Sequence, residues 1–87
     1  MDLTREIARQ LGLHREEKGV VVIRVEPGSG AEETGIRKGD VIEEMDRKKV
    51  TGIDDYNKIV AGIRPGETVL LFINRGGKKF YVTVRAS

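Results

Sequence analysis

Short apolar runs, separated by turns rich in glycine and charge, divide this 87-residue chain into regular elements. The run Val20–Val25 is almost continuously β-branched, which predicts a buried strand over Gly19–Val25. Further strands are predicted at Val41–Met45, at Glu67–Asn74 and at Lys79–Arg85. After a turn at 46–49, the chain is expected to resume a strand briefly at Val50. Residues 75–78, Arg-Gly-Gly-Lys, have the composition of a hairpin turn, so the last two strands are expected to pair.

A helical spacing replaces this pattern near the start of the chain. Apolar side chains recur every four positions from Leu3 to Leu11, which predicts an amphipathic helix over Thr4–Leu11. Asp2 or Thr4 can accept the free N–H groups at the start of this helix.

Two more helices are predicted further along. Pro27-Gly28 favours a tight turn, and Ser29 can cap a short helix over 30–35 that the last glycine closes in a left-handed conformation. The segment Ile53–Ile63 carries apolar residues along one side, and Asp54-Asp55 suits the positive end of a helix.

These elements predict an α+β fold. We expect a small twisted sheet, or partly open β-barrel, of about five strands with two or three short helices. The length allows one modest core, so residues 1–87 are expected to form a single domain.

Composition narrows the classes of partner. The chain is 38% hydrophobic and 34% charged, with a net charge of +2 and the two signs interleaved. A nucleic-acid partner is not expected, because phosphate binding needs a clustered basic face. Membrane insertion is not expected either, because the longest apolar runs, Val20–Ile23 and Val69–Ile73, are too short to span a bilayer.

Catalytic and metal-binding patterns are not found in the sequence. His14 is the only histidine, Ser29 and Ser87 are the only serines, and cysteine is absent, so neither a catalytic residue nor a metal or cofactor is expected. Residues 30–35 have the G-x-x-x-x-G spacing of a phosphate loop, but Ile-Arg follows where Lys and Ser or Thr are needed. The acidic pairs Glu43-Glu44 and Asp54-Asp55 are sequence neighbours rather than opposed carboxylates.

The most informative motif spans Val25–Ile42. It reads V-E-P-G-S-G-A, then Gly35-Ile36, then K-G-D-V-I. This is similar to the signature V-x-P-G-S-P-A…A-G-(L/I)-x-x-G-D-V-I of PDZ domains in bacterial HtrA/Deg (Do-like) serine proteases. Gly30 replaces the usual proline and Thr34 the usual alanine, and neither change is expected to break the fold.

The ends of the chain extend the resemblance. Residues 2–13, D-L-T-R-E-I-A-R-Q-L-G-L, resemble the D-L-T-P-E-(L/I)-A-x-x-L-G-L segment of the same group. The turn D-R-K-K-V at 46–50, in place of the commoner N-G-K-P-V, is more similar to the second of two tandem PDZ domains. A PDZ domain of another bacterial membrane or processing protease stays an alternative.

The resemblance implies a non-catalytic peptide-binding and regulatory module of a periplasmic serine endopeptidase. Such a domain takes an extended peptide, usually the C-terminus of an unfolded protein, as an added strand beside its second long helix. Neighbouring protease or PDZ domains are the other implied partners, and the alternative role is an assembly module that joins domains or subunits of the protease oligomer.

Two expectations concern the binding groove. Tyr56, Ile59, Val60 and Ile63 have first of all the spacing of core residues, so Asn57, Val60 and Ala61 are predicted to face the peptide. In the permuted bacterial topology the carboxylate loop and the peptide-pairing strand precede the D-L-T segment as an x-L-G-(V/I) motif. Because this chain starts at Met1-Asp2-Leu3, its groove is expected to lack one wall.

Overall fold

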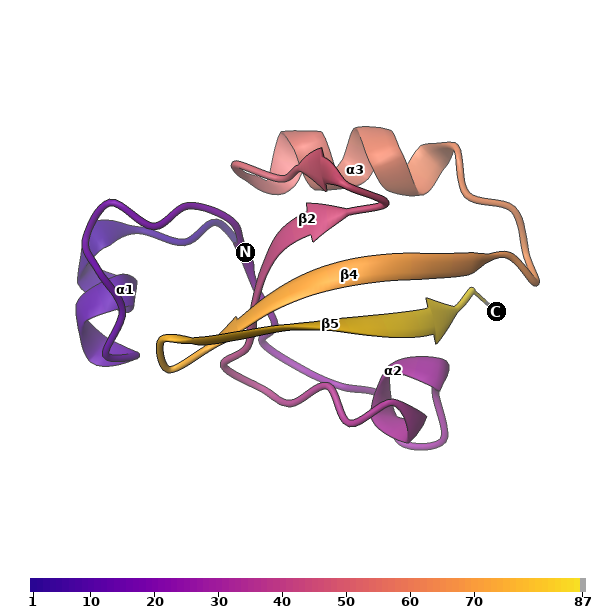
Figure 1. Ribbon diagram of the computed structural model, residues 1–87, viewed down its shortest axis with the longest axis horizontal. Coiled ribbons are helices and arrows are strands. Elements are labelled where there is room, and N and C mark those ends of the chain that lie inside the picture. The colour runs from indigo at the N-terminus through magenta and orange to yellow at the C-terminus, as the bar shows by residue number, and fades with distance from the viewer. Residues whose placement is uncertain (87) are drawn as a thin grey trace.

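A five-stranded antiparallel sheet forms the framework of the computed structural model, which describes residues 1–86 (Figure 1). Its strands are β1 (Val20–Val21), β2 (Val41–Met45), β3 (Lys48–Lys49), β4 (Thr68–Arg75) and β5 (Lys78–Arg85). The strands are hydrogen-bonded in the order β1-β2-β4-β5, and β3 pairs with β2 outside this path. The predicted α+β architecture is therefore confirmed. Ser87 lies outside the described residues.

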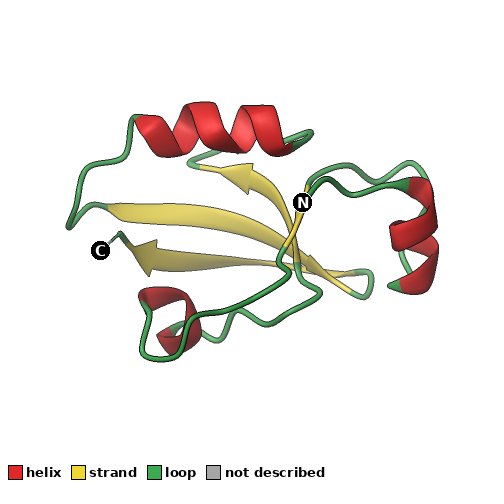
Figure 2. Cartoon of the chain, turned by 180° about the vertical axis from the view of Figure 1, so that it is seen from behind, coloured by secondary structure: helices red, strands yellow, loops and turns green. Residues whose placement is uncertain are grey.

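Three short helices surround the sheet, namely α1 (Arg5–Gln10), α2 (Gly30–Glu33) and α3 (Ile53–Ala61). The two views of the ribbon place α1 near the turn of the β4–β5 hairpin, and α3 and α2 on opposite sides of the strands (Figures 1 and 2). The predicted caps at Thr4 and Ser29 are confirmed, because each side chain accepts a main-chain N–H three residues on. Gly35 follows α2 with a φ of +87°, as predicted.

The core has two apolar clusters. The larger one lies between the sheet and the helices α2 and α3, and its buried members are Val20, Ile36, Ile42, Met45, Val50, Val69, Leu71 and Ile73. The smaller one lies under α1, and its buried members are Ala8, Leu13, Val21 and Val41. Val20 and Val21 belong to different clusters because successive side chains of a strand point to opposite faces.

The predicted buried strand over Gly19–Val25 is wrong beyond Val22. The ladder contains Val20–Val21, and Val22 then exchanges two main-chain hydrogen bonds of 2.8 Å with Gly39-Asp40. At that point the turn before β2 carries the partner segment away, so residues 23–25 have no strand beside them. Ile23 is accordingly 58% exposed rather than buried.

Other boundaries differ from the predicted ones by one or two residues, among them those of the strand after β2 and of α3. The strand after β2 is Lys48–Lys49 rather than a return at Val50, because Asp46 and Arg47, with φ of 50° and 67°, form a tight two-residue turn. Val50 is a core residue, 1% exposed. The helix α3 ends at Ala61, two residues before the predicted end.

Candidate functional site

An apolar cavity of about 460 Å³ opens between α3 and the segment that follows β1. One wall consists of Tyr56, Val60 and Ile63, and the opposite wall consists of Val22, Arg24 and Val25. Side chains of β2 and β4 form the floor, namely Ile42, Met45, Val69 and Leu71. This volume falls within the range of pockets that bind small ligands or single side chains of a partner.

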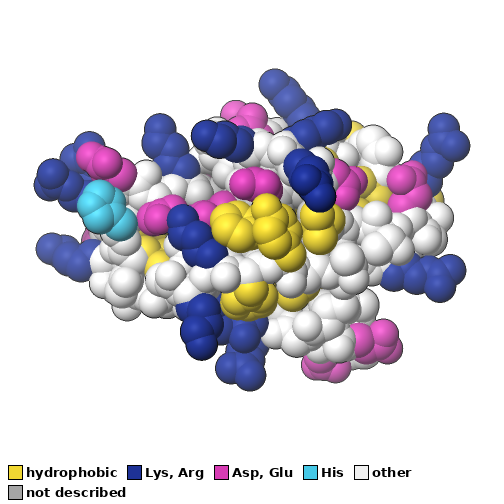
Figure 3. All heavy atoms as spheres, viewed as in Figure 1, with side chains coloured by type: hydrophobic (Ala, Val, Ile, Leu, Met, Phe, Trp, Pro, Cys, Tyr) yellow, Lys and Arg dark blue, Asp and Glu magenta, His cyan; other side chains and the backbone are white. Residues whose placement is uncertain are grey.

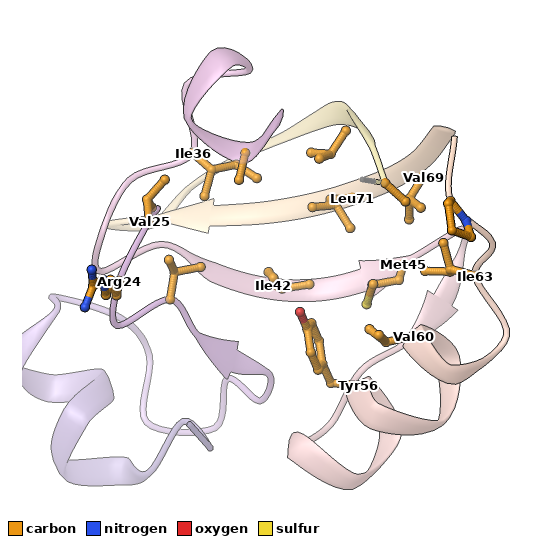
Figure 4. A pocket seen from close by; sticks show the side chains of 15 residues that line it. Arg24, Val25, Ile36, Ile42, Met45, Tyr56, Val60, Ile63, Val69 and Leu71 are labelled. Carbon is orange, nitrogen blue, oxygen red and sulfur yellow. The ribbon is translucent and has the colours of Figure 1, made fainter. Parts of the chain in front are cut away.

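The helix wall is built by side chains that point into the cavity (Figure 4). The ring of Tyr56 is directed toward Ile42 on β2, and Val60 and Ile63 follow it along the helix side. Positions four and seven residues apart lie on one face of a helix, so this wall follows from the spacing. Val60 is 39% exposed and therefore lies at the mouth of the cavity.

The opposite wall ends in an open strand edge. The N–H of Val21 donates to the carbonyl of Met1 at 2.8 Å, and the carbonyl of Val21 accepts from the amino group of Met1 at 3.2 Å. The main-chain groups of Val22 point the opposite way and bond to Gly39 and Asp40. Because these directions alternate along an extended chain, the N–H and C=O of Ile23 point to the same edge as those of Val21. Within residues 1–86, the main-chain groups of Ile23 have no hydrogen-bond partner. A further strand that pairs at this edge would lie next to the cavity.

The charge at this site is sparse. Among the lining residues within 1–86, Arg24 is the one with a charged side chain. Its Nε lies 3.1 Å from a carboxylate oxygen of Glu26, and both side chains are largely exposed. Such an exposed pair is weak in water and easily exchanged for another partner. The site therefore combines an apolar interior with one available cation at its rim.

The structure brings together only part of the predicted peptide-facing set. Val60 lines the cavity, and its contact with a peptide stays a prediction. Asn57 and Ala61 are exposed on α3 and are not among the lining residues, so their contact with a peptide stays a prediction. Tyr56 and Ile63, whose spacing indicates core packing, are half-buried and line the cavity as well. Periodicity alone could not reveal this double role, because it depends on the void beneath the helix.

A polar cluster lies away from the cavity, at the turn end of the β4–β5 hairpin. Lys79 Nζ lies 3.1 Å from Glu17 and 3.2 Å from Glu43, and Asn74 donates to Glu43 at 3.1 Å. Burial raises the pKa of Glu43. The pKa of Glu17 is lowered, chiefly because Glu17 forms a hydrogen bond with Glu43. Hydrogen bonding to Glu17 raises the pKa of Lys79. These groups satisfy one another, so they form a structural network.

The remaining candidate groups are dispersed. His14 is exposed, and its Nδ1 accepts the N–H of Glu16 at 3.2 Å. Among residues 1–86, no three His, Asp or Glu side chains converge to hold a metal ion. In the same part of the chain, no helix is long and apolar enough to cross a membrane.

Known sequences share this pattern. A family model described as "PDZ domain" matches residues 10–85. A protein of Chlamydia pneumoniae named "Probable periplasmic serine endoprotease DegP-like" is 40% identical over 75 residues, which cover 86% of this chain and 15% of that protein. A protein of the same name from Rhizobium meliloti is 37% identical over 76 residues, covering 87% of this chain and 15% of its own length.

Solved structures agree with the sequence matches. A structure titled "HtrA-type protease AlgW with decapeptide" superimposes with a TM-score of 0.85 at 33% identity, covering 98% of this chain and 26% of that one. The PDZ domain of an SdrC-like protein from Listeria monocytogenes superimposes with a TM-score of 0.73 over 84% of this chain and 76% of its own. At 20% identity the latter supports the fold alone. The chain thus spans about 15% of the length of these curated relatives.

Proposed function

The chain belongs to the PDZ domain family, and from this premise we propose that it binds an extended apolar peptide along the open edge beside α3. The peptide pairs as a strand with the free main-chain groups of Ile23, and one of its side chains enters the cavity between α3 and the sheet. The observation that carries this proposal is that the main-chain groups of Ile23, unpaired within residues 1–86, lie beside an apolar cavity of about 460 Å³. Strand addition supplies affinity and the cavity supplies selectivity.

The lining of the cavity favours apolar peptide segments over charged ones. Of the described residues that line the cavity, Arg24 alone is a cation, and it sits at the rim, where solvent screens its charge. Apolar contact with Val60 and Ile63 therefore provides most of the binding energy. Asn57 and Ala61, exposed on the same helix, contact the outer side of a bound peptide.

A nuclear magnetic resonance titration tests this proposal. A decapeptide with an apolar last residue is added to the ¹⁵N-labelled chain, once with a free carboxylate and once amidated. We expect both forms to shift the amide signals of Ile23, Val60 and Ile63. Shifts restricted to the outer face of the sheet, or no shifts at millimolar peptide, would contradict binding at this groove.

In its cellular setting, we propose that the chain is a non-catalytic regulatory module of a larger periplasmic serine protease. The names of the curated relatives support this setting, because they describe periplasmic serine endoproteases. The module would hold unfolded segments, including C-terminal ones, close to a protease domain. Deleting it from the parent protease should slow degradation of an unfolded protein while leaving cleavage of a short peptide unchanged.

A second candidate function, an assembly module, is favoured by the outer face of the sheet. Tyr81 is 54% exposed and its ring centroid lies 4.6 Å from that of Phe72, with Leu70 on the same strand face. Figure 3 shows hydrophobic side chains gathered over β4 and β5 on this face. Exposed aromatic patches of this kind are typical of contacts between domains. Sedimentation of the parent protease with Tyr81→Ser would show smaller oligomers if this face joins subunits.

A further inference from the structure

One hydrogen bond connects α3 to a distant part of the chain. Oδ1 of Asp2 accepts the N–H of Ile53, the first residue of the helix. The contact between Thr51 and Asp55 closes a local turn ahead of the helix. Within residues 1–86, no other hydrogen bond and no ion pair joins α3 to another element.

The helix depends on this bond because it has no cap of its own. Its N-cap is Gly52, which has no side chain to accept the first free N–H groups. Asp2 provides both an acceptor and a negative charge at the positive end of the helix. None of the residues of α3 is fully buried, and Ile53, Tyr56 and Ile59 pack against the core while partly exposed, so the hydrogen bond to Asp2 adds to this packing.

Asp2 is itself fixed at the edge of the sheet. It forms an antiparallel bridge with Val20. On either side of it, the carbonyl of Met1 accepts from Val21 at 2.8 Å, and Leu3 donates to the carbonyl of Gly19 at 3.0 Å. Asp2 therefore joins the two walls of the cavity, with its main chain on β1 and its side chain on α3.

We propose that Asp2 is a positioning residue that sets the spacing between α3 and the sheet edge, and thereby holds the cavity open at the width a peptide needs. This inference rests on the peptide-binding function proposed above. It makes the groove responsive to the segment 1–3: movement of this segment away from β1 pulls on the start of α3 and changes the wall that carries Val60. Preorganisation of a site in its binding-competent form increases affinity without adding contacts.

Three substitutions break or weaken the hydrogen bond between Asp2 and Ile53, two at Asp2 and one beside the helix. Asp2→Ala removes the acceptor, and Asp2→Asn keeps an acceptor oxygen without the charge. Gly52→Ala acts from the helix side, because its Cβ would lie 2.8 Å from Oδ1 of Asp2 and must displace the carboxylate. The backbone at Gly52 has a φ of −177°, which alanine adopts freely.

Amide hydrogen exchange in the absence of peptide measures how much the Asp2–Ile53 hydrogen bond stabilises the start of α3. We expect exchange at the start of α3 to accelerate about fivefold in Asp2→Ala and in Gly52→Ala, the effect of losing one helix cap. Asp2→Asn should accelerate it less. The double variant should exchange no faster than Asp2→Ala, because both changes break the same bond. Unchanged exchange in Asp2→Ala, or additive effects in the double variant, would overturn the proposal.

Affinity for the apolar decapeptide measures the consequence for binding. We expect about fivefold weaker binding for Asp2→Ala and Gly52→Ala. Thr4→Ala is the matched control, because it removes the cap of α1 two residues away and should leave α3 exchange and affinity unchanged. Faster α3 exchange with unaltered affinity would overturn the positioning role. If the unmodified chain binds no peptide but hydrogen exchange at α3 accelerates as expected in the variants, the proposed peptide-binding function is wrong. The stabilising role of the Asp2–Ile53 hydrogen bond is then still supported.

Discussion

Arg75 holds the buried carboxylate of Asp40 with two hydrogen bonds of 2.8 Å, one from Nε and one from a terminal nitrogen. Asp40 is 1% exposed and also accepts the N–H of Arg37 at 2.9 Å. The same guanidinium donates to the carbonyl of Gly35 at 2.9 Å and lies 4.9 Å from the centroid of the Phe80 ring. The hydrogen bond to Asp40 raises the pKa of Arg75. The pair ties the loop after α2 to the β4–β5 hairpin, so the Gly-Asp motif of the sequence has a structural role.

Loss of this pair should destabilise the fold. Asp40→Ala leaves Arg75 without its main partner, although the Arg75 side chain is 32% exposed and can recover part of its hydration. We expect the free energy of unfolding in urea to fall by about 2–3 kcal/mol. Glu26→Ala is the control, since it removes the exposed pair with Arg24 and should change stability by less than about 0.5 kcal/mol. Equal effects of the two substitutions would contradict the structural role of Asp40.

A close backbone approach at Gly19 gives a second prediction. Its φ is +151°, and an added Cβ would lie 2.5 Å from the carbonyl oxygen of Ile42 on β2. Gly19→Ala should therefore force β1 away from β2 and lower the unfolding free energy by about 3 kcal/mol. Gly12 also has a positive φ, of +72°, but an added methyl group would meet open space. Gly12→Ala should therefore lower the unfolding free energy by only about 1 kcal/mol. Thermal or urea unfolding of both variants separates crowding from backbone strain alone.

The cluster around Glu43 predicts a pH dependence of stability. Burial raises the pKa of Glu43 in the folded state above its ordinary value of 4.5, so the folded protein holds this proton more tightly than the unfolded chain. Stability from this group is greatest below pH 4.5 and is lost as the pH rises through the raised pKa. The pKa of Glu17 is lowered in the folded state, so its effect on stability has the opposite pH dependence. Glu17 contributes stability above pH 4.5, and this contribution is lost as the pH falls through the lowered pKa.

The substitution Glu43→Gln isolates the first effect. Glutamine keeps an oxygen for Asn74, while Lys79 keeps its contact with Glu17 at 3.1 Å. The unfolding free energy of Glu43→Gln, relative to the unmodified chain, should therefore increase between pH 4.5 and pH 7. Urea titrations at the two pH values provide the comparison. A constant difference would show that the carboxyl of Glu43 titrates normally.

Local signals were sufficient for much of the fold. Val41–Met45 is found with the predicted bounds, and Thr4 and Ser29 cap the helices predicted for them, because turn chemistry and capping depend on neighbours in sequence. The segment after Val22 was mispredicted because its β-branched composition favours a strand, whereas pairing depends on where the partner segment turns away.

The candidate site was less predictable because it depends on long-range contacts. Asp2 was one of two candidates to cap the first helix, yet it caps α3, 51 positions further along the chain. The free edge at Ile23 follows from where the sheet ladder ends, which no local pattern encodes. The helical spacing places Val60 beside the core positions, and its side chain is 39% exposed and lines the cavity, whereas its contact with a peptide stays a prediction.

The central claim is that the cavity beside α3 receives an apolar peptide, and calorimetric titration of the decapeptide against two charged variants tests it most directly. Val60→Asp places a carboxylate at the mouth of the cavity, whereas Lys58→Asp places a carboxylate on α3 at an exposed position that does not line the cavity. We predict at least about tenfold weaker binding for Val60→Asp and less than about twofold change for Lys58→Asp, because only the former desolvates a charge. Equal affinities of the two variants would contradict peptide binding in this cavity.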